Sequence, residues 1–201
     1  AKSIGPVEVS PERMDLAEIQ NNRFCLPDAE AAKAAEDYLD QKIAECDSVG
    51  GVVECVISGL PVGLGEPVFE KLDANLAKAI LSIGAVKGFE IGGGFAATKA
   101  CGSENNDEFR MDGDKIVKET NHAGGVLGGI SDGSDVVFRA AFKPTPSIAK
   151  SQETVTKDGA NIDLVIHGRH DPVVVPRAVV VVESMAAITA MDMLLVSMTS
   201  R

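Results

Sequence analysis

The sequence predicts an α+β fold. Two helical patterns alternate with two strand patterns in the first half of the chain, and three strand patterns then follow one another without a helix between them. A repeating βαβ protein would keep alternating. With 201 residues, 45% of them apolar, the chain is long enough for a sizeable core, so we expect one globular unit over residues 1–201.

The regular elements of the first half follow from periodicity. A helix is expected over residues 27–47, where apolar residues recur at helical spacing after a Pro27-Asp28 start. The β-branched run that follows predicts a strand over 50–61. A second helix is expected from residue 65 to near Gly84, and a strand over 85–92 comes after it.

The second half begins with a long polar segment. Residues 92–129 are rich in glycine and polar side chains, so we expect no regular element there and a functional or mobile role. Strands are expected over 135–142, 151–159 and 161–168, the last two joined by a Lys-Asp-Gly turn.

The chain closes on a strongly apolar segment over residues 176–198. Its length and its Ala, Met and Leu content favour a buried helix, although Val179–Val182 alone would suit a strand. No window reaches the roughly 20 uninterrupted apolar residues of a membrane helix, and the first residues lack the order of a signal peptide. We expect a cytoplasmic protein that does not contact membranes.

Composition narrows the range of molecules that the chain is expected to bind. The net charge of −11 and the absence of Trp disfavour nucleic acid. The four cysteines contain no C-x-x-C pair, so neither a zinc site nor a redox motif is expected, and we predict no metal. Residues 121–178 hold six basic and six acidic residues, so an anionic small molecule could bind in this neutral third of the chain.

Paired glycines form the first candidate motif, "NHAGGVLGGISDG". Such pairs let a backbone approach a flat or anionic ligand closely, or they merely form tight turns, and the second interpretation is the more frequent one. The spacing matches no nucleotide-binding fingerprint. The nearby His122 and His167 are expected to be structural.

The second motif is "KPTPSI", residues 143–148. It combines one cation, two hydroxyls and two prolines, so a rigid loop could present Lys143, Thr145 and Ser147 to phosphate oxygens. A proline-rich connection between strands explains the same residues equally well.

The third motif is "GRHDP", where two interpretations stay open. Asp171 could cap the closing helix, with Pro172 in its first turn and Arg169 paired with a surface carboxylate. The same strand-to-helix junction could instead aim N–H groups and side chains at a bound anion.

Four stretches of the chain, in order, resemble the chorismate synthase family: "LPVGLGEPVFEKLDANLAKAILSIGAVKGFEIGGGF", "GSENNDEF", "NHAGGVLGGISDGSDVVFRAAFKPTPSI" and "GRHDPVVVPRAVVVVESMAAI". The resemblance runs from about Ser3 to Leu195. It implies a β-α-β sandwich, with helices between antiparallel sheets, of which about half of the full domain is present.

The resemblance also implies the chemistry. Family members are lyases of the shikimate pathway to aromatic amino acids, and they remove phosphate from 5-enolpyruvylshikimate 3-phosphate by anti-1,4-elimination to give chorismate. They need reduced FMN as cofactor, and they are usually homotetramers. An NADP-dependent reduction of the flavin and the capture of FMN already reduced both stay open.

Individual residues follow from the aligned motifs. Asp171 matches a catalytic acid suspected of helping proton removal near the flavin N5. The other matching positions resemble cofactor contacts: Gly84 and Ala85 after the second helix, Gly128 in the paired glycines, the loop Lys143, Pro144, Thr145, Pro146 and Ser147, and Arg169.

Two family motifs do not occur in the chain: Gly-Glu-Ser-His-Gly, and one of the Arg-Ser-Ser-Ala-Arg-Glu type. These motifs supply catalytic histidines and substrate arginines. We therefore expect the C-terminal portion of a longer chorismate synthase domain, inactive alone, whose partner is the missing N-terminal half. The alternatives are a non-catalytic FMN- or phosphate-binding fragment, an assembly partner of a split enzyme, and a nonfunctional remnant.

Overall fold

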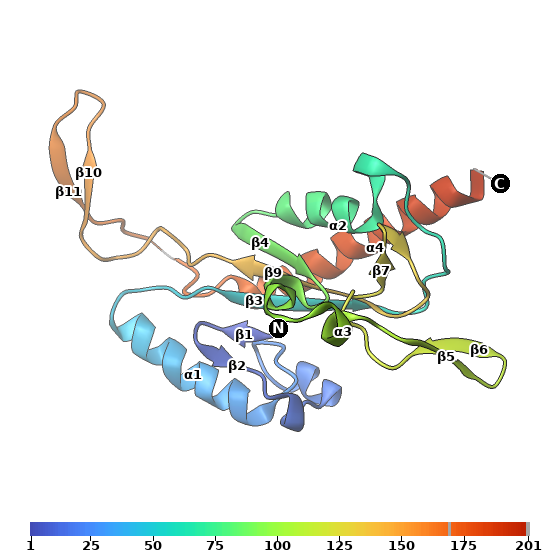
Figure 1. The fold of residues 1–201 in the computed structure, drawn as a ribbon. Coiled ribbons are helices and arrows are strands. Elements are labelled where there is room, and N and C mark those ends of the chain that lie inside the picture. The colour runs from blue at the N-terminus through green and yellow to red at the C-terminus, as the bar shows by residue number, and fades with distance from the viewer. Residues whose placement is uncertain (169, 200–201) are drawn as a thin grey trace. The chain divides into compact units, whose positions relative to one another are not determined.

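A computed structural model describes residues 1–168 and 170–199 of the chain (Figure 1). The chain forms two compact units. The first consists of Ala1–Val53 and Phe142–Val179, and the second of Glu54–Ala141 and Val180–Arg201. The single globular unit expected from the sequence stays a prediction.

The first unit begins with a small sheet and one long helix. Strands β1 (Ser3–Ile4) and β2 (Val7–Glu8) are antiparallel, and β1 also pairs with the start of β3 (Gly51–Ile57), which gives the order β2-β1-β3. Two short 3-10 turns, η1 (Pro11–Arg13) and η2 (Leu16–Gln20), lead to α1 (Ala29–Ala44), which packs on β2. The predicted first helix and first strand are confirmed.

Helix α1 starts where it does because of Asp28. This buried side chain accepts hydrogen bonds from the backbone N–H groups of Glu30 and Ala31, at 3.0 and 3.1 Å, and it pairs with Arg13. Burial alone would raise the pKa of Asp28, but hydrogen bonds from Ala31 N, Arg13 and Ser10 N lower it to about 2. The helix start is thus fixed by a charged cap.

A long hairpin completes the sheet structure of the first unit (Figure 1). Strands β10 (Gln152–Val155) and β11 (Asn161–Leu164) are antiparallel. The N–H of Thr156 donates to the carbonyl of Ala160 at 2.9 Å, and this bond closes the turn. Both strands and the Lys-Asp-Gly turn confirm the sequence prediction.

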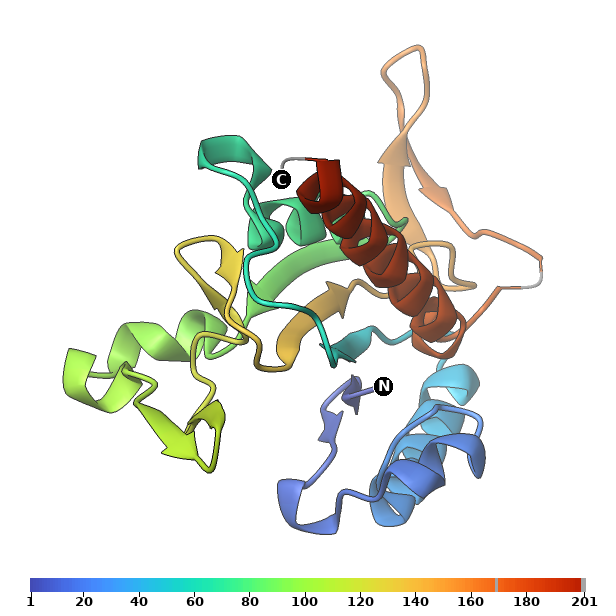
Figure 2. The same ribbon diagram turned by 90° about the vertical axis from the view of Figure 1, so that its right-hand side faces the viewer.

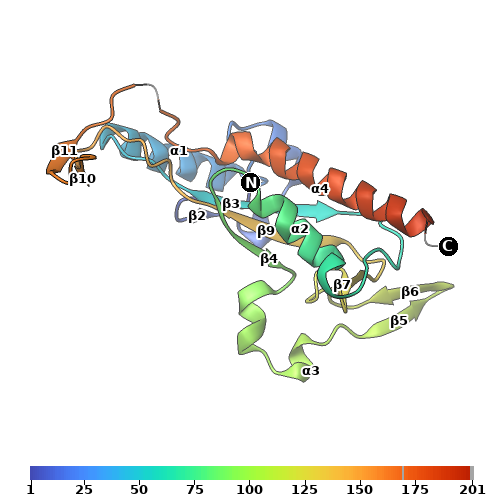
Figure 3. The same cartoon turned by 90° about the horizontal axis from the view of Figure 1, so that it is seen from above.

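The second unit packs one helix on a sheet. Within this unit the strand order is β3-β9-β4, with β4 at Val86–Ile91 and β9 at Val136–Phe142. Helix α2 (Leu72–Leu81) packs on β4 (Figure 3), and Phe89 and Phe138 stack with ring centroids 5.3 Å apart. The predicted second helix and both strands are confirmed.

The predicted start of that helix was too early. Residues Val68–Glu70 form a separate 3-10 turn, η3, before α2. Val68, the first residue of this turn, has a φ of +61°, and Lys71, which follows the turn, is extended. The backbone is therefore outside the helical region at both positions, and the turn does not continue into α2.

The prediction of no regular element over residues 92–129 was wrong. A second hairpin lies there, in which β5 (Phe109–Asp112) pairs with β6 (Lys115–Lys118) around a two-residue turn at Gly113 and Asp114. Gly113 has a φ of +59°, which such a turn requires. The other elements of this region are short: η4 (Gly94–Lys99), α3 (Gly102–Asn105), β7 (Val126–Leu127) and, just after it, β8 (Ile130–Ser131).

Helix α4 (Val175–Thr199) closes the chain as one continuous helix (Figure 2). The predicted helix is confirmed, but it is buried along one face only. The buried stripe consists of Val175, Ala178, Val182, Ala186, Thr189, Ala190 and Met193, and the exposed face carries Val180, Ile188, Met191, Leu195 and Met198.

By length and composition, α4 could cross a membrane, because an 18-residue window has a mean hydropathy of 2.0. This is weak evidence, since the core helix of a globular protein passes the same test. Glu183 and Asp192 interrupt the apolar run, and the buried stripe is typical of an amphipathic packing helix.

Candidate functional site

The first unit contains a pocket of about 320 Å³, a size within the range of small-molecule sites. Three segments far apart in the sequence line it: the end of α1 with the residues that follow it, the loop after β9, and the residues before α4. The lining residues are Ile43, Cys46, Asp47, Ser48, Ser147, Ile148, Ala149, Gly168, His170, Asp171 and Pro172.

Hydrogen bonds tie the three segments together. Ser48 Oγ donates to the carbonyl of Thr145 at 2.7 Å, and Thr145 Oγ1 donates to the carbonyl of Asp171 at 2.9 Å. The N–H of Val49 donates to the carbonyl of Pro172 at 2.8 Å. Thr145 therefore has a definite structural role: it joins its own loop to both of the other segments.

An ion pair adds a fourth connection. Lys150 Nζ lies 2.6 Å from Asp47 Oδ2. The hydrogen bond from Lys150, with one from Ser48 N, lowers the pKa of Asp47 from its usual value. Asp47 is thus a carboxylate at neutral pH, and Lys150 does not line the pocket.

Two glycines after α1 allow this close packing. A Cβ atom on Gly50 would lie 2.3 Å from the carbonyl oxygen of Phe142 and 3.2 Å from Pro144 Cδ. A Cβ on Gly51 would lie 2.3 Å from the carbonyl oxygen of Ser3. Only glycine lets the start of β3 pass this close to the backbone that leads into the predicted cofactor loop.

Asp171 lines the pocket but does not cap α4. The helix begins at Val175, four residues later, and Pro176 rather than Pro172 lies in its first turn. The capping interpretation was therefore wrong, because Asp171 Oδ2 instead accepts a hydrogen bond from Arg177 Nη1 in that first turn. The Asp171 side chain is 43% exposed, and the residue lines the pocket.

His170 contributes a buried polar atom with no partner. Within residues 1–168 and 170–199, its Nε2 is the buried side-chain nitrogen or oxygen that makes no hydrogen bond. The sequence pattern does not single out His170, Asp47, Ser48 or Cys46. For His170 the available signal was its place inside "GRHDP"; for the others only their tertiary neighbours reveal the role.

The predicted cofactor residues are divided between the units. Ser147 and Asp171 line the pocket of the first unit. The other predicted residues of the Ser147 loop do not line it: Lys143, Pro144, Thr145 and Pro146. Gly84, Ala85 and Gly128 belong to the second unit. Arg169 lies outside the described residues, as does its predicted ion pair.

Two of the predicted contacts in the second unit, Ala85 and Gly128, have a positive φ. Ala85 has a φ of +71°, which is uncommon for a residue with a side chain, whereas Gly84 has no positive φ. Gly128, with a φ of +63°, forms the two-residue turn of the β7–β8 hairpin together with Gly129. The tight-turn interpretation of this glycine pair is thus confirmed, and no atom lies within 4 Å of the position of a Cβ on Gly128.

A buried charge network supports the other glycine pair, Gly124 and Gly125. Lys118 Nζ, whose side chain is 2% exposed, lies 2.7 Å from Asp132 Oδ2 and 3.4 Å from Asp107 Oδ2, and it donates to Asn121 Oδ1 at 3.1 Å. Asn121 Oδ1 also accepts from the N–H of Gly125 at 2.8 Å.

Asp107 organises the residues just before these glycines. It accepts hydrogen bonds from Thr120 Oγ1 and from the N–H groups of His122 and Ala123. Burial raises the pKa of Asp107, but these hydrogen bonds and the charge of Lys118 lower it well below its usual value. His122 Nδ1 lies 3.3 Å from the same carboxylate, so this exposed histidine has an acidic partner that its sequence neighbours do not provide.

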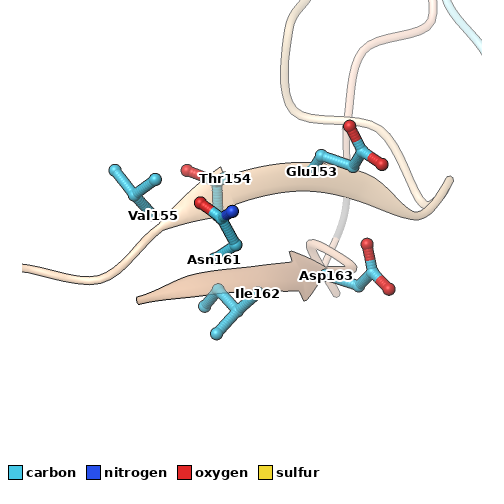
Figure 4. Close-up of a pocket in the computed structure, with 6 residues that line it drawn as sticks. All are labelled: Glu153, Thr154, Val155, Asn161, Ile162 and Asp163. Atoms are coloured by element: carbon cyan, nitrogen blue, oxygen red, sulfur yellow. The ribbon is translucent and has the colours of Figure 1, made fainter. Parts of the chain in front are cut away.

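A concave surface also lies along the β10–β11 hairpin (Figure 4). Glu153 and Asp163 are cross-strand partners, and their carboxylates lie at the same end of the hairpin. The described residues contain no group of three or more metal-ligating side chains, here or elsewhere. Two like charges and no cation make this surface a poor site for an anionic ligand.

Known proteins are similar to this chain in sequence and in fold. The family model described as chorismate synthase matches residues 1–195. The chain is 60% identical over 201 residues to the chorismate synthase of Lachnoclostridium phytofermentans, covering 55% of that protein, and 62% identical over 200 residues to that of Agathobacter rectalis, covering 54%. A crystal structure of chorismate synthase superposes with a TM-score of 0.80 at 31% identity, over 98% of this chain and 56% of that chain.

The fold defines an α+β protein of mixed helix and antiparallel sheet, and a solved chorismate synthase shares it. More particularly, the chain belongs to the chorismate synthase family. It spans about half the length of the curated relatives that it matches.

Proposed function

We propose that the chain carries part of the FMN and substrate site of a chorismate synthase, which removes phosphate and a proton from 5-enolpyruvylshikimate 3-phosphate to form chorismate. The supporting observation is the pocket of the first unit, where Ser147 of the predicted cofactor loop and the predicted catalytic Asp171 line one cavity.

The residues present fit a flavin. The pocket offers apolar walls from Ile43, Ile148 and Pro172, together with a buried histidine nitrogen that lacks a partner. When bound, reduced FMN supplies electron density that stabilises the departure of the phosphate. The loop at 143–147 holds the cofactor, and its exposed Lys143 is placed to offset a phosphate charge.

Asp171 is the residue that we propose to handle the proton. Its carboxylate lies at the pocket wall and is oriented by Arg177 and by the bond from Thr145 to its own carbonyl. A carboxylate held in this way can accept or relay a proton at a defined point. Gly84, Ala85, Gly128 and Arg169 remain proposed contacts to the cofactor.

A turnover experiment tests the proposal. The chain alone, supplied with reduced FMN and substrate, should form little or no chorismate. Adding the part of a chorismate synthase that the chain does not span should restore turnover, and Asp171→Asn should then reduce the rate. Turnover by the chain alone at the rate of a complete enzyme would contradict the incomplete site.

A second candidate is a non-catalytic fragment that binds FMN or phosphate, or an assembly partner. The exposed apolar face of α4 favours assembly, because monomeric proteins rarely expose large contiguous apolar patches. FMN titration separates the two: Lys143→Ala and Arg169→Ala should both weaken binding if the cofactor site is real. Failure of the unchanged chain to bind flavin would favour a purely structural role.

The assembly and setting belong to the same proposal. We infer a cytoplasmic homotetramer, on family resemblance, with NADP as the reductant only if the complete enzyme reduces its own flavin. Size-exclusion chromatography with light scattering measures the oligomer, and reduction of bound FMN by NADPH under anaerobic conditions measures the second point.

A further inference from the structure

The β7–β8 hairpin of the second unit carries Gly128 on two very short legs. Each strand has two residues, so the turn formed by Gly128 and Gly129 lies only two residues from the base of the hairpin on either side. No atom lies within 4 Å of the position of a Cβ on Gly128, so a ligand can approach the backbone there. A shift at the base is therefore carried directly to this residue.

The base of the β7 leg has no side chain of its own to fix its position. Gly124 and Gly125 precede β7, with φ values of +66° and +78°. A Cβ atom on Gly124 would lie 2.4 Å from the backbone nitrogen of Gly92, and one on Gly125 would lie 2.5 Å from the carbonyl oxygen of Asp135. Side chains are thus excluded at both positions, and glycine backbone is the freest of all. Neighbouring groups have to fix this leg.

Lys118 holds both legs at the base of the hairpin. On the β7 side, Asn121 Oδ1 accepts hydrogen bonds from the N–H of Gly125 at 2.8 Å and from Lys118 Nζ at 3.1 Å. On the β8 side, the same ammonium lies 2.7 Å from Oδ2 of Asp132, the residue that directly follows the strand. The N–H of Asp132 donates to the carbonyl of Gly125 at 3.1 Å and closes the base.

Other contacts hold a different part of the hairpin. The N–H of Leu72 donates to the carbonyl of Gly129 at 2.8 Å, and Ser131 Oγ donates to the carbonyl of Pro61 at 2.6 Å. These bonds act on β8 and on the second residue of the turn. Lys118 acts through Asn121 on the β7 leg, so its loss should displace the turn while leaving the hairpin formed.

We propose that Lys118 is a positioning residue of the cofactor site: its ammonium fixes the base of the β7–β8 hairpin so that Gly128 can approach FMN. Lys118 acts through Asn121 and Asp132 and does not itself touch the cofactor. This inference rests on the proposed FMN site. It adds a residue that lies between the stretches that resemble the family.

The experiment measures FMN binding to the chain combined with the part of a chorismate synthase that it does not span. Lys118→Met and Asn121→Ala should each weaken FMN binding about tenfold, because each cuts the link between the ammonium and Gly125. The visible circular dichroism of the bound flavin, which depends on the asymmetric surroundings of the ring, should change in both variants. Asn121→Ala keeps the buried ion pairs, so it tests the same link if Lys118→Met does not fold.

Two controls separate positioning from stability, at a temperature at which every variant is folded. Asp132→Asn added to Lys118→Met should recover part of the stability but not the FMN affinity, because the link to Asn121 stays broken. Ile80→Ala removes a fully buried side chain of α2, lowers stability by a similar amount, and leaves the base of the hairpin intact. It should bind FMN within about twofold of wild type.

Three outcomes would overturn the inference. Wild-type affinity in both Lys118→Met and Asn121→Ala would remove the positioning role while leaving the proposed function intact. Recovery of affinity together with stability in the double variant, or an equal loss of affinity in Ile80→Ala, would make Lys118 merely structural. Absence of FMN binding in the wild type would reject the proposed function itself, and with it the inference that rests on it.

Discussion

Lys118 offers the sharpest test of how the second unit is held together. Lys118→Met removes a cation whose side chain is 2% exposed and leaves Asp107 and Asp132 buried without it. Breaking a buried ion pair by deleting one partner costs about 3–5 kcal/mol. We expect the lower end, about 3 kcal/mol, because Asp107 keeps its hydrogen bonds from Thr120, His122 and Ala123.

Urea unfolding followed by far-ultraviolet circular dichroism measures this change. Lys115→Met is the matched control, since Lys115 is an exposed cation on the same strand, and it should change the free energy of unfolding by less than about 0.5 kcal/mol. Asp132→Asn added to Lys118→Met should recover part of the loss, because it removes the buried charge with the fewest remaining donors.

The free energy of unfolding depends on pH with a definite sign. The pKa values of Asp107 and Asp132 are lowered on folding, so their contribution is complete above the usual carboxyl pKa and is lost as pH falls through their lower folded values. The difference between wild type and Lys118→Met should therefore shrink below about pH 4, as the carboxylates become protonated. A difference equal to that of Lys115→Met at pH 7, or one that grows in acid, would refute the reasoning.

Three further predictions follow from single residues. Thr145→Val removes the hydrogen bond to the Asp171 carbonyl, so it should lower the free energy of unfolding in urea by about 1 kcal/mol and weaken FMN binding. Thr145→Ser should restore the stability and the binding, and a loss in Thr145→Ser equal to that in Thr145→Val would contradict this role. Ala85→Gly relieves a φ of +71° and should raise the free energy of unfolding by about 0.5 kcal/mol; a loss would mean that the strain is absent or offset. Asp28 has a folded pKa of about 2 against an ordinary 3.8. The free energy of unfolding of wild type should therefore exceed that of Asp28→Asn by about 2 kcal/mol at pH 7, and this gap should close from about pH 4 to pH 2 in acid titration. A gap independent of pH would reject the last prediction.

Local rules predict an element well when its own residues supply the decisive contacts. Helix α1 could be placed to within two residues at its start because Asp28 caps it directly, and the β10–β11 hairpin because its turn is local. The β5–β6 hairpin escapes the same rules. Every residue of β5 is exposed, so the strand carries no buried, apolar face to signal its period.

The start of α4 shows how a correct local rule can select the wrong residue. Asp171 and Pro172 match a helix start by residue type. In the structure, Thr145 Oγ1 donates a hydrogen bond to the carbonyl of Asp171, and the N–H of Val49 donates one to the carbonyl of Pro172. The helix begins only at Val175. These partners come from distant segments, so no window of the sequence around "GRHDP" contains the information.

The same limit applies to the side-chain partners of His170 and Asp171, the neighbours in that motif. Asp171 accepts a hydrogen bond from Arg177, whereas the buried Nε2 of His170 makes none within the described part of the chain, a difference that the order of the residues cannot reveal. Arg177 is 78% exposed, and exposed ion pairs contribute only about 0–1 kcal/mol. A group that engages Asp171 therefore displaces Arg177 at small cost. We therefore propose Asp171, whose exposed partner is readily released, as the residue that handles the proton.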